Sequence, residues 1–455
     1  MQSDDSSNAT YPRLAAAKAE MMAKTKKCRA MTEDRESILF SGMRANLSMP
    51  HPIFIASGEG AHIRDIDGND YIDTVMGFGA CVLGHRHPEV AEAIGRVSGS
   101  GWHFGIHSRE QLPLAEMLYE AIPCAERILF CNTGSEATAY AMRAARMFTG
   151  KEKIGIFDGY WHGMHDYCMV APAPDGSSKR PKALAISGGV PKAVHDLTVP
   201  LAYRNEISLD IIRENADALA VVLIEPVQHS NPQPEVADFL RAVQDVCREC
   251  GVLFLLDEMV TGFRIAYGGG QERFGITPDL ATLGKACGGG VPIGLVAGRE
   301  DIMRTFVGDN GAPPPVFTGG TFTGNPLTMA AGTAAVGYMK RHPEIYAHME
   351  AQGNRLSAAF NGYCAQHNMP IHMSNVGSMF HIYFQGNPVH SSFDIDEQPL
   401  AAAKRAFCLH ALNLGVLISG GDRYYLSAAH TAADVDRMIE VFEETLVLLR
   451  EDDLI

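Results

Sequence analysis

The chain has 455 residues, of which 46% are hydrophobic and 20% are charged, and its formal net charge is −15. This length supports a large core and two lobes, and the acidic balance argues against partners such as nucleic acid or an anionic membrane surface. The amino terminus is polar and acidic, and no apolar run approaches the length of a membrane span, so we expect a cytoplasmic protein.

The first 75 residues are expected to contain a helix and a small antiparallel unit. Residues 11–33 are rich in Ala, Lys and Met, which is typical of a helix. Residues 50–75 alternate apolar and polar side chains around an Asp-x-Asp-Gly turn, which predicts short antiparallel strands. We assign residues 1–75 to a smaller lobe.

Strand and helix patterns alternate from residue 76 to residue 325, which predicts a large α/β domain with a mostly parallel central sheet flanked by helices. Residues 326–355 are expected to form one long helix or two. We assign residues 326–455 to a small α+β domain that completes the smaller lobe, so both termini belong to that lobe.

A strand-to-helix junction within the large domain has the features of a phosphate site. A strand pattern ends at Cys131, and an Ala-rich helix pattern runs from Ser135 until Gly150. Gly134 permits close approach to the backbone, and Ser135 is expected to cap the helix. The free amides of the first turn favour a phosphate by about 0.5–2 kcal/mol, although an ordinary capped helix start has the same pattern.

Two further predicted strands are each followed by a residue with an ionisable side chain. The apolar run 251–256 leads into Asp257, and the run 280–284 leads into Lys285, which precedes a glycine triplet. An anion cradle, a carboxylate and a lysine at strand ends are what pyridoxal 5′-phosphate (PLP) requires. Asp257 would keep the pyridine nitrogen protonated, and Lys285 would form a Schiff base and act as the base. A carboxylate that only ends a strand or caps a helix is an equally good reading of Asp257 alone. The apolar run before Lys285 and the glycine triplet after it argue against an ordinary surface-loop lysine.

The motifs together resemble those of the class III aminotransferases of PLP fold type I, and within them the branch that contains glutamate-1-semialdehyde aminomutase. The resemblance runs from about Ser57 to Ile439. Its motifs lie at residues 65–73 (DIDGNDYID), 84–90 (GHRHPEV), 132–138 (NTGSEAT), 157–163 (FDGYWHG), 225–226 (EP), 256–264 (LDEMVTGFR), 285 (the lysine), 320–326 (GTFTGNP) and 427–431 (SAAHT).

The resemblance implies roles for further residues. Gly134 and Ser135 would bind the phosphate of the cofactor. Trp161 would stack on one face of the cofactor ring, and Met259 would pack on the other face. Thr321 would donate to the phosphate of the cofactor in the neighbouring subunit, which implies a homodimer.

The chain departs from the aminomutase pattern in two segments that lie near substrate in the family. Residues 40–46 read FSGMRAN where the aminomutase has Pro-Gly-Gly followed by Asn-Ser-Pro, and residues 420–425 also differ. These segments make Arg44 and Arg423 candidates to bind a substrate carboxylate, although an arginine in such a segment is more often a surface residue. Trp161 also replaces the usual Tyr and reshapes the roof of the pocket.

Two enzyme functions are consistent with the resemblance. A transaminase would pass an amino group from a small-molecule amino donor to a keto acid or aldehyde by a ping-pong mechanism through the Lys285 Schiff base. An aminomutase, which is an isomerase, would move the amino group within one molecule. The two departures favour the transaminase, whereas Val260 in place of the Gln of many ω-aminotransferases favours the aminomutase branch.

Other classes of protein fit less well. A scaffold that kept the fold and lost catalysis would not need both Asp257 and Lys285. A nicotinamide-dependent dehydrogenase would need GxGxxG spacing after a strand, which the glycine runs lack. The 10 cysteines and 18 histidines form no set with metal-ligand spacing, so we expect no metal.

Overall fold

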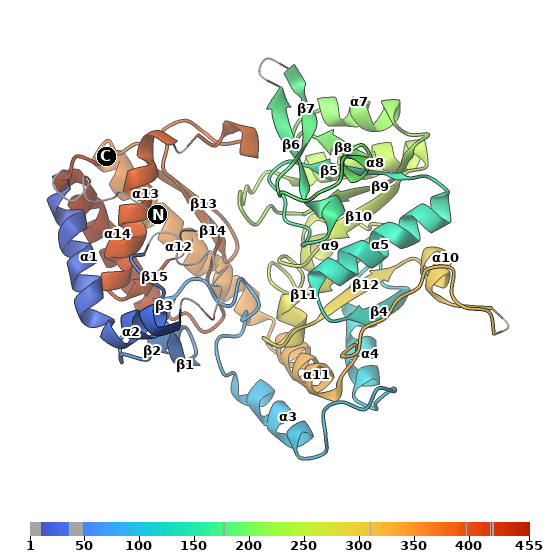
Figure 1. Ribbon diagram of the computed structural model, residues 1–455, viewed down its shortest axis with the longest axis horizontal. Helices are drawn as coiled ribbons and strands as arrows, with labels where there is room; N and C mark the ends of the chain where they lie inside the picture. Colours follow the sequence, from blue (N-terminus) through green and yellow to red (C-terminus); the bar gives the residue numbers. More distant parts are fainter. Residues whose placement is uncertain are drawn as a thin grey trace. The chain divides into compact units, whose positions relative to one another are not determined.

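The computed structural model describes residues 11–35, 49–175, 178–309, 311–396, 398–418, 420 and 423–455. These residues form two compact units (Figure 1). The first unit comprises the described parts of residues 1–87, 347–388 and 395–455, and the second comprises those of residues 88–346 and 389–394. This division differs from the expected boundaries at 75 and 325: residues 76–87 belong to the first unit, and residues 326–346 belong to the second, where α11 (Pro326–Arg341) packs against α3 (Pro88–Ser98).

The first unit contains two small sheets and a group of helices. The sheets have the strand orders β1-β2-β3-β15 and β13-β14-β16. The strands are β1 (Ile55–Glu59), β2 (His62–Asp65), β3 (Asp70–Asp73), β13 (His372–Val376), β14 (Met379–Tyr383), β15 (Val416–Leu417) and β16 (Tyr424–Tyr425). The helices are α1 (Pro12–Lys24), α2 (Lys26–Arg35), α13 (Ala401–Asn413) and α14 (Ala432–Glu451), together with α12 (Glu344–Gln366) from residue 347 onward.

Two expectations for this unit can be compared with the structure. The antiparallel unit expected over residues 50–75 is confirmed by the pairing of β2 with both β1 and β3. The helix expected over residues 11–33 is instead two helices, because the chain breaks at Thr25. The hydroxyl of Thr25 donates to the carbonyl of Met21 and also contacts Nε2 of His51, which holds this break in place.

The second unit is built on a seven-stranded sheet with the order β4-β12-β11-β10-β9-β5-β8. Its strands are β4 (Arg127–Cys131), β5 (Lys153–Phe157), β8 (Thr198–Leu201), β9 (Leu219–Ile224), β10 (Leu253–Asp257), β11 (Leu280–Gly284) and β12 (Gly294–Gly298). β12 runs antiparallel to both of its neighbours, and β11, β10, β9, β5 and β8 are parallel. The mostly parallel sheet predicted from the sequence is therefore confirmed.

The pattern of apolar residues explains how the sheet and helices of this unit pack in layers. Every residue of β9, β10 and β11 is buried, as expected for parallel strands covered on both faces. On α8 (Ala237–Cys250) the buried residues Leu240, Val243, Val246 and Cys247 follow a helical spacing and form one apolar stripe. The other helices are α4 (Gln111–Ala121), α5 (Gly134–Thr149), α6 (Lys192–His195), α7 (Ile207–Glu214), α9 (Gly269–Phe274) and α10 (Glu300–Met303), and β6 (Val170–Asp175) pairs with β7 (Ser178–Ala185).

Two connections in the second unit place the functional segments. α5 follows β4 after two residues, so its amino terminus lies at the carboxyl end of that strand. Gly150 ends α5 with a left-handed φ of 70°, as the sequence predicts. In the part of the chain that the structure describes, none of the helices combines the length and apolar character needed to span a bilayer.

Candidate active site

Asp257 ends β10 at the carboxyl edge of the sheet and is only 2% exposed. Its Oδ2 lies 2.7 Å from Nδ1 of His162. Its Oδ1 accepts from the backbone N–H of Met259 at 3.0 Å and from the hydroxyl of Thr282 at 3.2 Å. Thr282 is the residue opposite Asp257 in the parallel pairing of β10 and β11, so the sheet register sets this contact. The carboxylate is thus held in one orientation through both of its oxygens.

His162 is fixed on several sides. Its side chain is completely buried, and the ring of Tyr160 stacks on it with centroids 4.6 Å apart. Its carbonyl oxygen accepts from the hydroxyl of Thr138 on α5 at 2.7 Å. Because the carboxylate of Asp257 acts as the acceptor, Nδ1 of His162 carries the proton of their hydrogen bond. Within the described residues, Nε2 of His162 is buried without a hydrogen-bond partner.

Met259 lies between the start of α5 and the end of β11. A Cβ atom on Gly134 would come within 2.9 Å of Sδ of Met259, and one on Gly284 would come within 2.8 Å of the same sulfur. Both distances are shorter than van der Waals contact, so glycine at these two positions makes room for the methionine. The contact brings together the predicted phosphate loop, the residue two positions after Asp257 and the residue before Lys285.

The start of α5 differs from the expectation that Ser135 caps the helix. The cap is Thr133, whose hydroxyl accepts from the N–H of Glu136 at 3.1 Å, while the carboxylate of Glu136 accepts from the N–H of Thr133 at 3.0 Å. This capping box was visible in the sequence as Thr-x-x-Glu. The hydroxyl of Ser135 instead accepts from the N–H of Met164 at 2.9 Å, which leaves its own proton for another acceptor.

The helix start retains the features of an anion site. The N–H groups of Gly134 and Ser135 belong to the first turn and therefore have no intrahelical acceptor. Gly163 lies against this turn with a φ of 109°, and a Cβ there would be 2.7 Å from Oγ of Ser135. The space beside the Ser135 hydroxyl is therefore preserved by a glycine. Amides and a hydroxyl at a helix amino terminus are a good match for a phosphate.

Lys285 follows β11 directly and opens a short 3₁₀ helix, Lys285–Gly288. It is half-buried, and its φ of 47° lies in the left-handed region, which costs a residue other than glycine on the order of 1 kcal/mol. Lys285 lies three residues beyond Thr282, whose hydroxyl contacts Asp257. Lys285 and Asp257 therefore lie at the ends of adjacent parallel strands, at the same edge of the sheet.

Trp161 is half-buried, and a buried carboxylate fixes its backbone. Its N–H donates to Oε1 of Glu225 at 2.8 Å, and Oε2 of Glu225 lies 2.9 Å from Nδ1 of His229. Burial pushes the pKa of Glu225 up, but the charge and hydrogen bonds of His229 more than offset this and lower the pKa to about 2. Glu225 was part of a sequence motif, but nothing local to it predicted that it would hold the Trp161 segment.

The Thr321 segment is tied to the phosphate loop of its own chain. The hydroxyl of Tyr140 donates to the carbonyl of Gly319 at 2.5 Å, and the amide of Asn132 donates to the hydroxyl of Thr323 at 3.3 Å. Thr321 lies between these two anchors and is exposed.

The structure does not place the two candidate substrate arginines relative to this site. Arg44 lies outside the described residues. Arg423 belongs to the first unit, immediately before β16. Their role as substrate residues stays a prediction.

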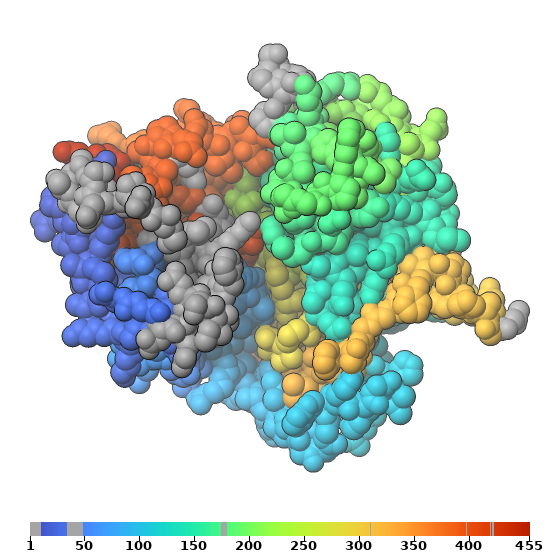
Figure 2. All heavy atoms as spheres, viewed as in Figure 1, coloured from blue at the N-terminus to red at the C-terminus, as the bar shows by residue number. Residues whose placement is uncertain are grey.

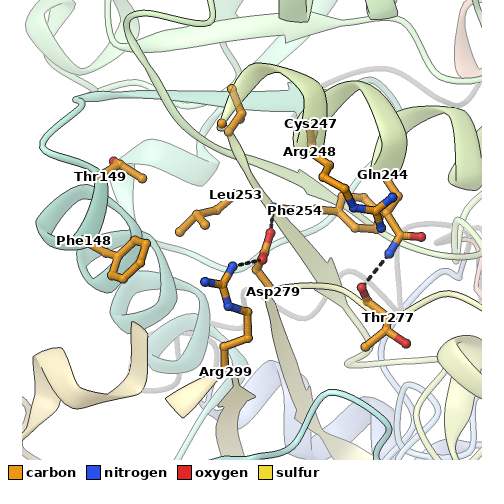
Figure 3. Close-up of a pocket in the computed structure, with 12 residues that line it drawn as sticks. Phe148, Thr149, Gln244, Cys247, Arg248, Leu253, Phe254, Thr277, Asp279 and Arg299 are labelled. Carbon is orange, nitrogen blue, oxygen red and sulfur yellow. Dashed lines mark hydrogen bonds and ion pairs between the residues drawn. The ribbon is translucent and has the colours of Figure 1, made fainter. Parts of the chain in front are cut away.

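A separate cavity of about 310 Å³ lies at the opposite edge of the same sheet (Figure 3). Nη1 of Arg299 lies 2.5 Å from Oδ1 of Asp279, and the other oxygen of Asp279 accepts from the N–H of Phe254 at 2.8 Å. The amide of Gln244 donates to the backbone carbonyl of Thr277. These polar groups bind one another, and ligands of open α/β sheets bind at the carboxyl edge, so we place the candidate active site around Asp257.

Comparison with known proteins decides the family. The family model described as "Aminotransferase class-III" matches residues 43–446. The chain belongs to the class III aminotransferases. Glutamate-1-semialdehyde 2,1-aminomutase from Thermus thermophilus is 37% identical over 401 residues, covering 87% of this chain and 91% of that protein. The aminomutase from Methanothermobacter thermautotrophicus is 35% identical over 405 residues, covering 87% and 93%.

Solved structures show the same relationship for this class III aminotransferase. An omega-transaminase from Sphaerobacter thermophilus is 30% identical, with a TM-score of 0.85 and coverage of 93% of this chain and 98% of that chain. A beta-phenylalanine aminotransferase from Variovorax paradoxus is 29% identical, with a TM-score of 0.83 and coverage of 97% and 98%. The fold type I architecture predicted from the sequence is confirmed.

The cofactor of this class III enzyme is pyridoxal 5′-phosphate, as the sequence predicts. The described residues fit it, because one edge of the sheet carries phosphate donors at a helix start, a buried carboxylate and a lysine amine. When bound, the cofactor acts as an electron sink for the substrate carbon that bears the amino group.

Proposed function

We propose that the protein is a transaminase that moves an amino group from an amino donor to a keto acid or an aldehyde by a ping-pong mechanism. The observation that carries this proposal is the convergence of Lys285, Asp257 and the start of α5 at one sheet edge, linked through Met259 and Thr282. A cofactor that needs an amine, an anion and phosphate donors has all three within this arrangement.

The proposed roles of the binding residues follow from their chemistry. The N–H groups of Gly134 and Ser135, with the Ser135 hydroxyl, hold the phosphate. Asp257 accepts from the protonated pyridine nitrogen. As the family resemblance implies, Trp161 and Met259 would lie on opposite faces of the ring and would supply the apolar contacts that hold it.

We assign the proton transfer to the amine of Lys285. With the cofactor bound, the amine of Lys285 would accept the proton from the substrate carbon that carries the amino group and would later give a proton back. The backbone of Lys285 is well anchored, because the residue opens a short 3₁₀ helix directly after a buried strand. The strained backbone at Lys285 is consistent with a functional constraint on this residue.

We also propose that the enzyme is a homodimer and that Thr321 donates to the phosphate in the partner's site. Apolar side chains near Thr321 are exposed in the single chain: Trp102 is 57% exposed, Ile106 80% and Phe317 76%. The segment that carries Phe317 and Thr321 lies on the surface of the second unit in yellow-orange (Figure 2). Exposed apolar groups of this size are typical of a surface that another protein covers.

The shape of the surface near Thr321 supports the same proposal. A cavity of about 640 Å³ opens beside Thr321 and is lined by residues 103–107, Gln111, Gly320, Thr321 and residues 323–326. The rings of His103 and Phe322 lie 5.1 Å apart, so the two lining loops contact each other. A second copy seated here would bring its own phosphate close to the hydroxyl of Thr321.

For substrate recognition we propose that Arg44 or Arg423 binds a substrate carboxylate. Each arginine stands in a segment that departs from the aminomutase pattern, and a guanidinium is well suited to bidentate binding of a carboxylate. Substitution of the binding arginine by Lys should raise the Michaelis constant for carboxylate substrates and leave that for neutral amines unchanged. An unchanged Michaelis constant for carboxylate substrates would rule that arginine out.

The second candidate function is that of a glutamate-1-semialdehyde 2,1-aminomutase. The relatives from Thermus thermophilus and Methanothermobacter thermautotrophicus carry this name at 37% and 35% identity over most of the chain. The two functions differ in their need for a separate amino donor. Conversion of glutamate-1-semialdehyde by the pyridoxamine form of the enzyme, without any added donor, would select the aminomutase.

A panel of amines and keto acids tests the transaminase directly. We expect at least one amine to change the absorbance of the bound cofactor and one keto acid or aldehyde to restore it. Reduction with borohydride should fix the cofactor to Lys285, as read by peptide mass spectrometry. Lys285→Ala should abolish turnover, whereas Lys340→Ala, at an exposed lysine that pairs with Glu120, should not. Turnover by Lys285→Ala at the parent rate would refute the assignment.

A further inference from the structure

The loop that follows β9 places a buried carboxylate and a buried imidazole beside the segment of Trp161. β9 lies between β5 and β10 in the sheet (Figure 1). Ile224 at the end of β9 is paired with Leu256 of β10, so Glu225 follows its strand at the same edge at which Asp257 ends the neighbouring strand. β5 runs parallel to β9 on the other side and ends shortly before Trp161. Glu225 therefore lies between the strand that carries Asp257 and the strand that leads to Trp161.

The imidazole of His229 holds the carboxylate of Glu225 through both of its oxygens. Nδ1 of His229 lies 3.0 Å from Oε1 and 2.9 Å from Oε2 of Glu225, and the backbone N–H of the same histidine donates to Oε2 at 2.9 Å. Both side chains are only 5% exposed, so water competes little for these contacts. Because an ionised carboxylate can only accept, Nδ1 of His229 carries the proton. His229 thus orients the carboxylate whose Oε1 accepts from the N–H of Trp161 at 2.8 Å.

His229 also keeps this carboxylate ionised. Burial raises the pKa of Glu225, but the charge of His229, followed by its side-chain hydrogen bond, more than offsets the effect of burial and lowers the pKa to about 2. The charge of His162 acts in the same direction. An ionised acceptor makes a shorter and stronger hydrogen bond to an amide than a neutral one. The imidazole of His229 therefore sets both the orientation and the strength of the bond to Trp161.

Two further side chains of the same loop hold the start of the segment that leads to Trp161. Nε2 of Gln228 donates to the carbonyl of Asp158, and the hydroxyl of Ser230 donates to the carbonyl of Gly159 at 2.8 Å. Gly159 has a φ of 71°, and a Cβ there would lie 2.9 Å from Nε2 of Gln228, so a glycine is needed for this close approach. The loop after β9 therefore holds successive backbone groups of the segment along its length.

We propose that His229 is a positioning residue for the cofactor: by orienting Glu225 it fixes the backbone of Trp161, and with it the indole that would cover one face of the cofactor ring. This proposal rests on the proposed function, in which Trp161 has that place. No proton transfer to substrate is assigned to His229, since its imidazole acts through the carboxylate. Stacked aromatic rings attract each other only within a narrow range of offsets and tilts, so a shifted backbone at Trp161 would weaken the contact.

The backbone amide of Trp161 can be observed directly, because the chain contains only two tryptophans. The holoenzyme is labelled with nitrogen-15 tryptophan for NMR, and Trp102→Phe identifies the remaining backbone amide peak as that of Trp161. An amide proton in a strong hydrogen bond to a carboxylate resonates downfield, so we expect His229→Leu to move this peak upfield. His229→Asn keeps an amide donor near the position of Nδ1 and should leave the peak close to its wild-type position. An unmoved peak in a folded His229→Leu enzyme would overturn the proposal.

The affinity for the cofactor tests whether this contact matters to the site. We expect the Kd for pyridoxal 5′-phosphate to rise about three- to tenfold in His229→Leu, because part of the roughly tenfold effect of a charged hydrogen bond reaches the ring. His229→Asn should recover most of the affinity. His410→Leu on α13 of the first unit is the matched control, since His410 is also 5% exposed, and it should change neither the peak nor the Kd. Equal changes in the two leucine variants, or a wild-type Kd in His229→Leu, would overturn the role in cofactor binding.

A second variant covers the case in which His229→Leu does not fold. Glu225→Gln removes the charged acceptor and should also move the Trp161 peak upfield, and an unmoved peak there would overturn the proposal. Failure of the proposed function is read separately, from a wild-type enzyme that binds the cofactor but transfers no amino group between any donor and acceptor of the panel. The Trp161 peak and the Kd values decide the role of His229 in either case.

Discussion

Nδ1 of His162 lies 2.7 Å from Oδ2 of Asp257 in a buried contact between segments 95 residues apart. This contact orients the carboxylate that we assign to the pyridine nitrogen, and His162 is therefore a positioning residue. His162 is in turn fixed by the stacked ring of Tyr160 and by the hydroxyl of Thr138 on the same helix that begins with the phosphate loop. His162 thus contacts both Asp257, which we assign to the pyridine ring, and α5, whose first turn we assign to the phosphate.

Removal of the His162 donor should weaken cofactor binding. His162→Leu loses a hydrogen bond to a charged group, which is worth about 1.5–3 kcal/mol, so we expect the Kd for pyridoxal 5′-phosphate to rise about tenfold or more. His162→Asn can place an amide donor near the position of Nδ1 and should recover most of the affinity. Titration of the apoenzyme with the cofactor measures both constants. Equal losses in the two variants would mean that packing, and not the donor, is what His162 contributes.

Asp257→Asn should keep some cofactor and lose most activity, because an amide has no charge with which to keep the pyridine nitrogen protonated. The weakened charge-assisted contact corresponds to about 1.5–3 kcal/mol, or a loss of roughly 10- to 100-fold in kcat/KM. Thr282→Val is the matched control, since it removes only the longer 3.2 Å contact to the same carboxylate and preserves its charge. Steady-state kinetics of the wild type and the two variants measures these losses. Turnover by Asp257→Asn at the wild-type rate would contradict the role assigned to Asp257.

The sequence predicted best those parts of the site that depend on local pattern. The strand ends at Asp257 and before Lys285 were visible because parallel strands buried on both faces are continuous apolar runs. The sequence around Thr133 also indicates a helix cap, but we predicted the cap at Ser135, two residues further along the chain. The helix actually begins at Gly134, and its cap is set by the Thr-x-x-Glu spacing.

Contacts between distant segments could not be predicted from the pattern. The carboxylate of Glu225 accepts a hydrogen bond from the backbone N–H of Trp161, 64 positions away in the sequence. The hydroxyl of Tyr140 donates a hydrogen bond to the carbonyl of Gly319, 179 positions away. Nothing in the local sequence distinguishes these side chains from other buried polar groups. The left-handed backbone at Lys285 is also invisible in sequence, since lysine does not favour that region.

Gly163→Ala should destabilise the enzyme and weaken cofactor binding. The added Cβ would lie 2.7 Å from Oγ and 2.8 Å from Cα of Ser135, at a φ of 109°. Gly150→Ala is the matched control, because Gly150 also has a positive φ but a Cβ there meets nothing within 4 Å. We expect the control to cost about 1 kcal/mol of unfolding free energy and Gly163→Ala about 1–3 kcal/mol more.

Chemical denaturation measures the stability of both glycine variants, and cofactor titration reads the phosphate site separately. Only Gly163→Ala should raise the Kd for pyridoxal 5′-phosphate, because only its methyl group presses on Ser135. Similar affinities in the two variants would show that the hydroxyl of Ser135 is not needed where we place it.

The pairing of His85 with Asp73 should make stability depend on pH in the alkaline range. Because the pKa of His85 is raised from 6.5 to about 10, the folded protein binds more protons than the unfolded chain between these two values. Stability from this pair is therefore fully present below about pH 6.5 and is lost as the pH rises through about 10. The Tm of the wild type should exceed that of His85→Gln most at pH 6.5, and the difference should shrink steadily toward pH 10.5.

The direction in which this Tm difference changes with pH distinguishes a charged His85–Asp73 pair from a neutral one. A neutral imidazole that only donates a hydrogen bond to Asp73 would give a Tm difference that does not change between pH 7 and pH 10.5. A buried, neutral histidine, such as His430, whose pKa is lowered to about 4 by burial, would destabilise the fold only on acidification. A Tm difference that grows with pH would contradict a protonated His85 paired with Asp73.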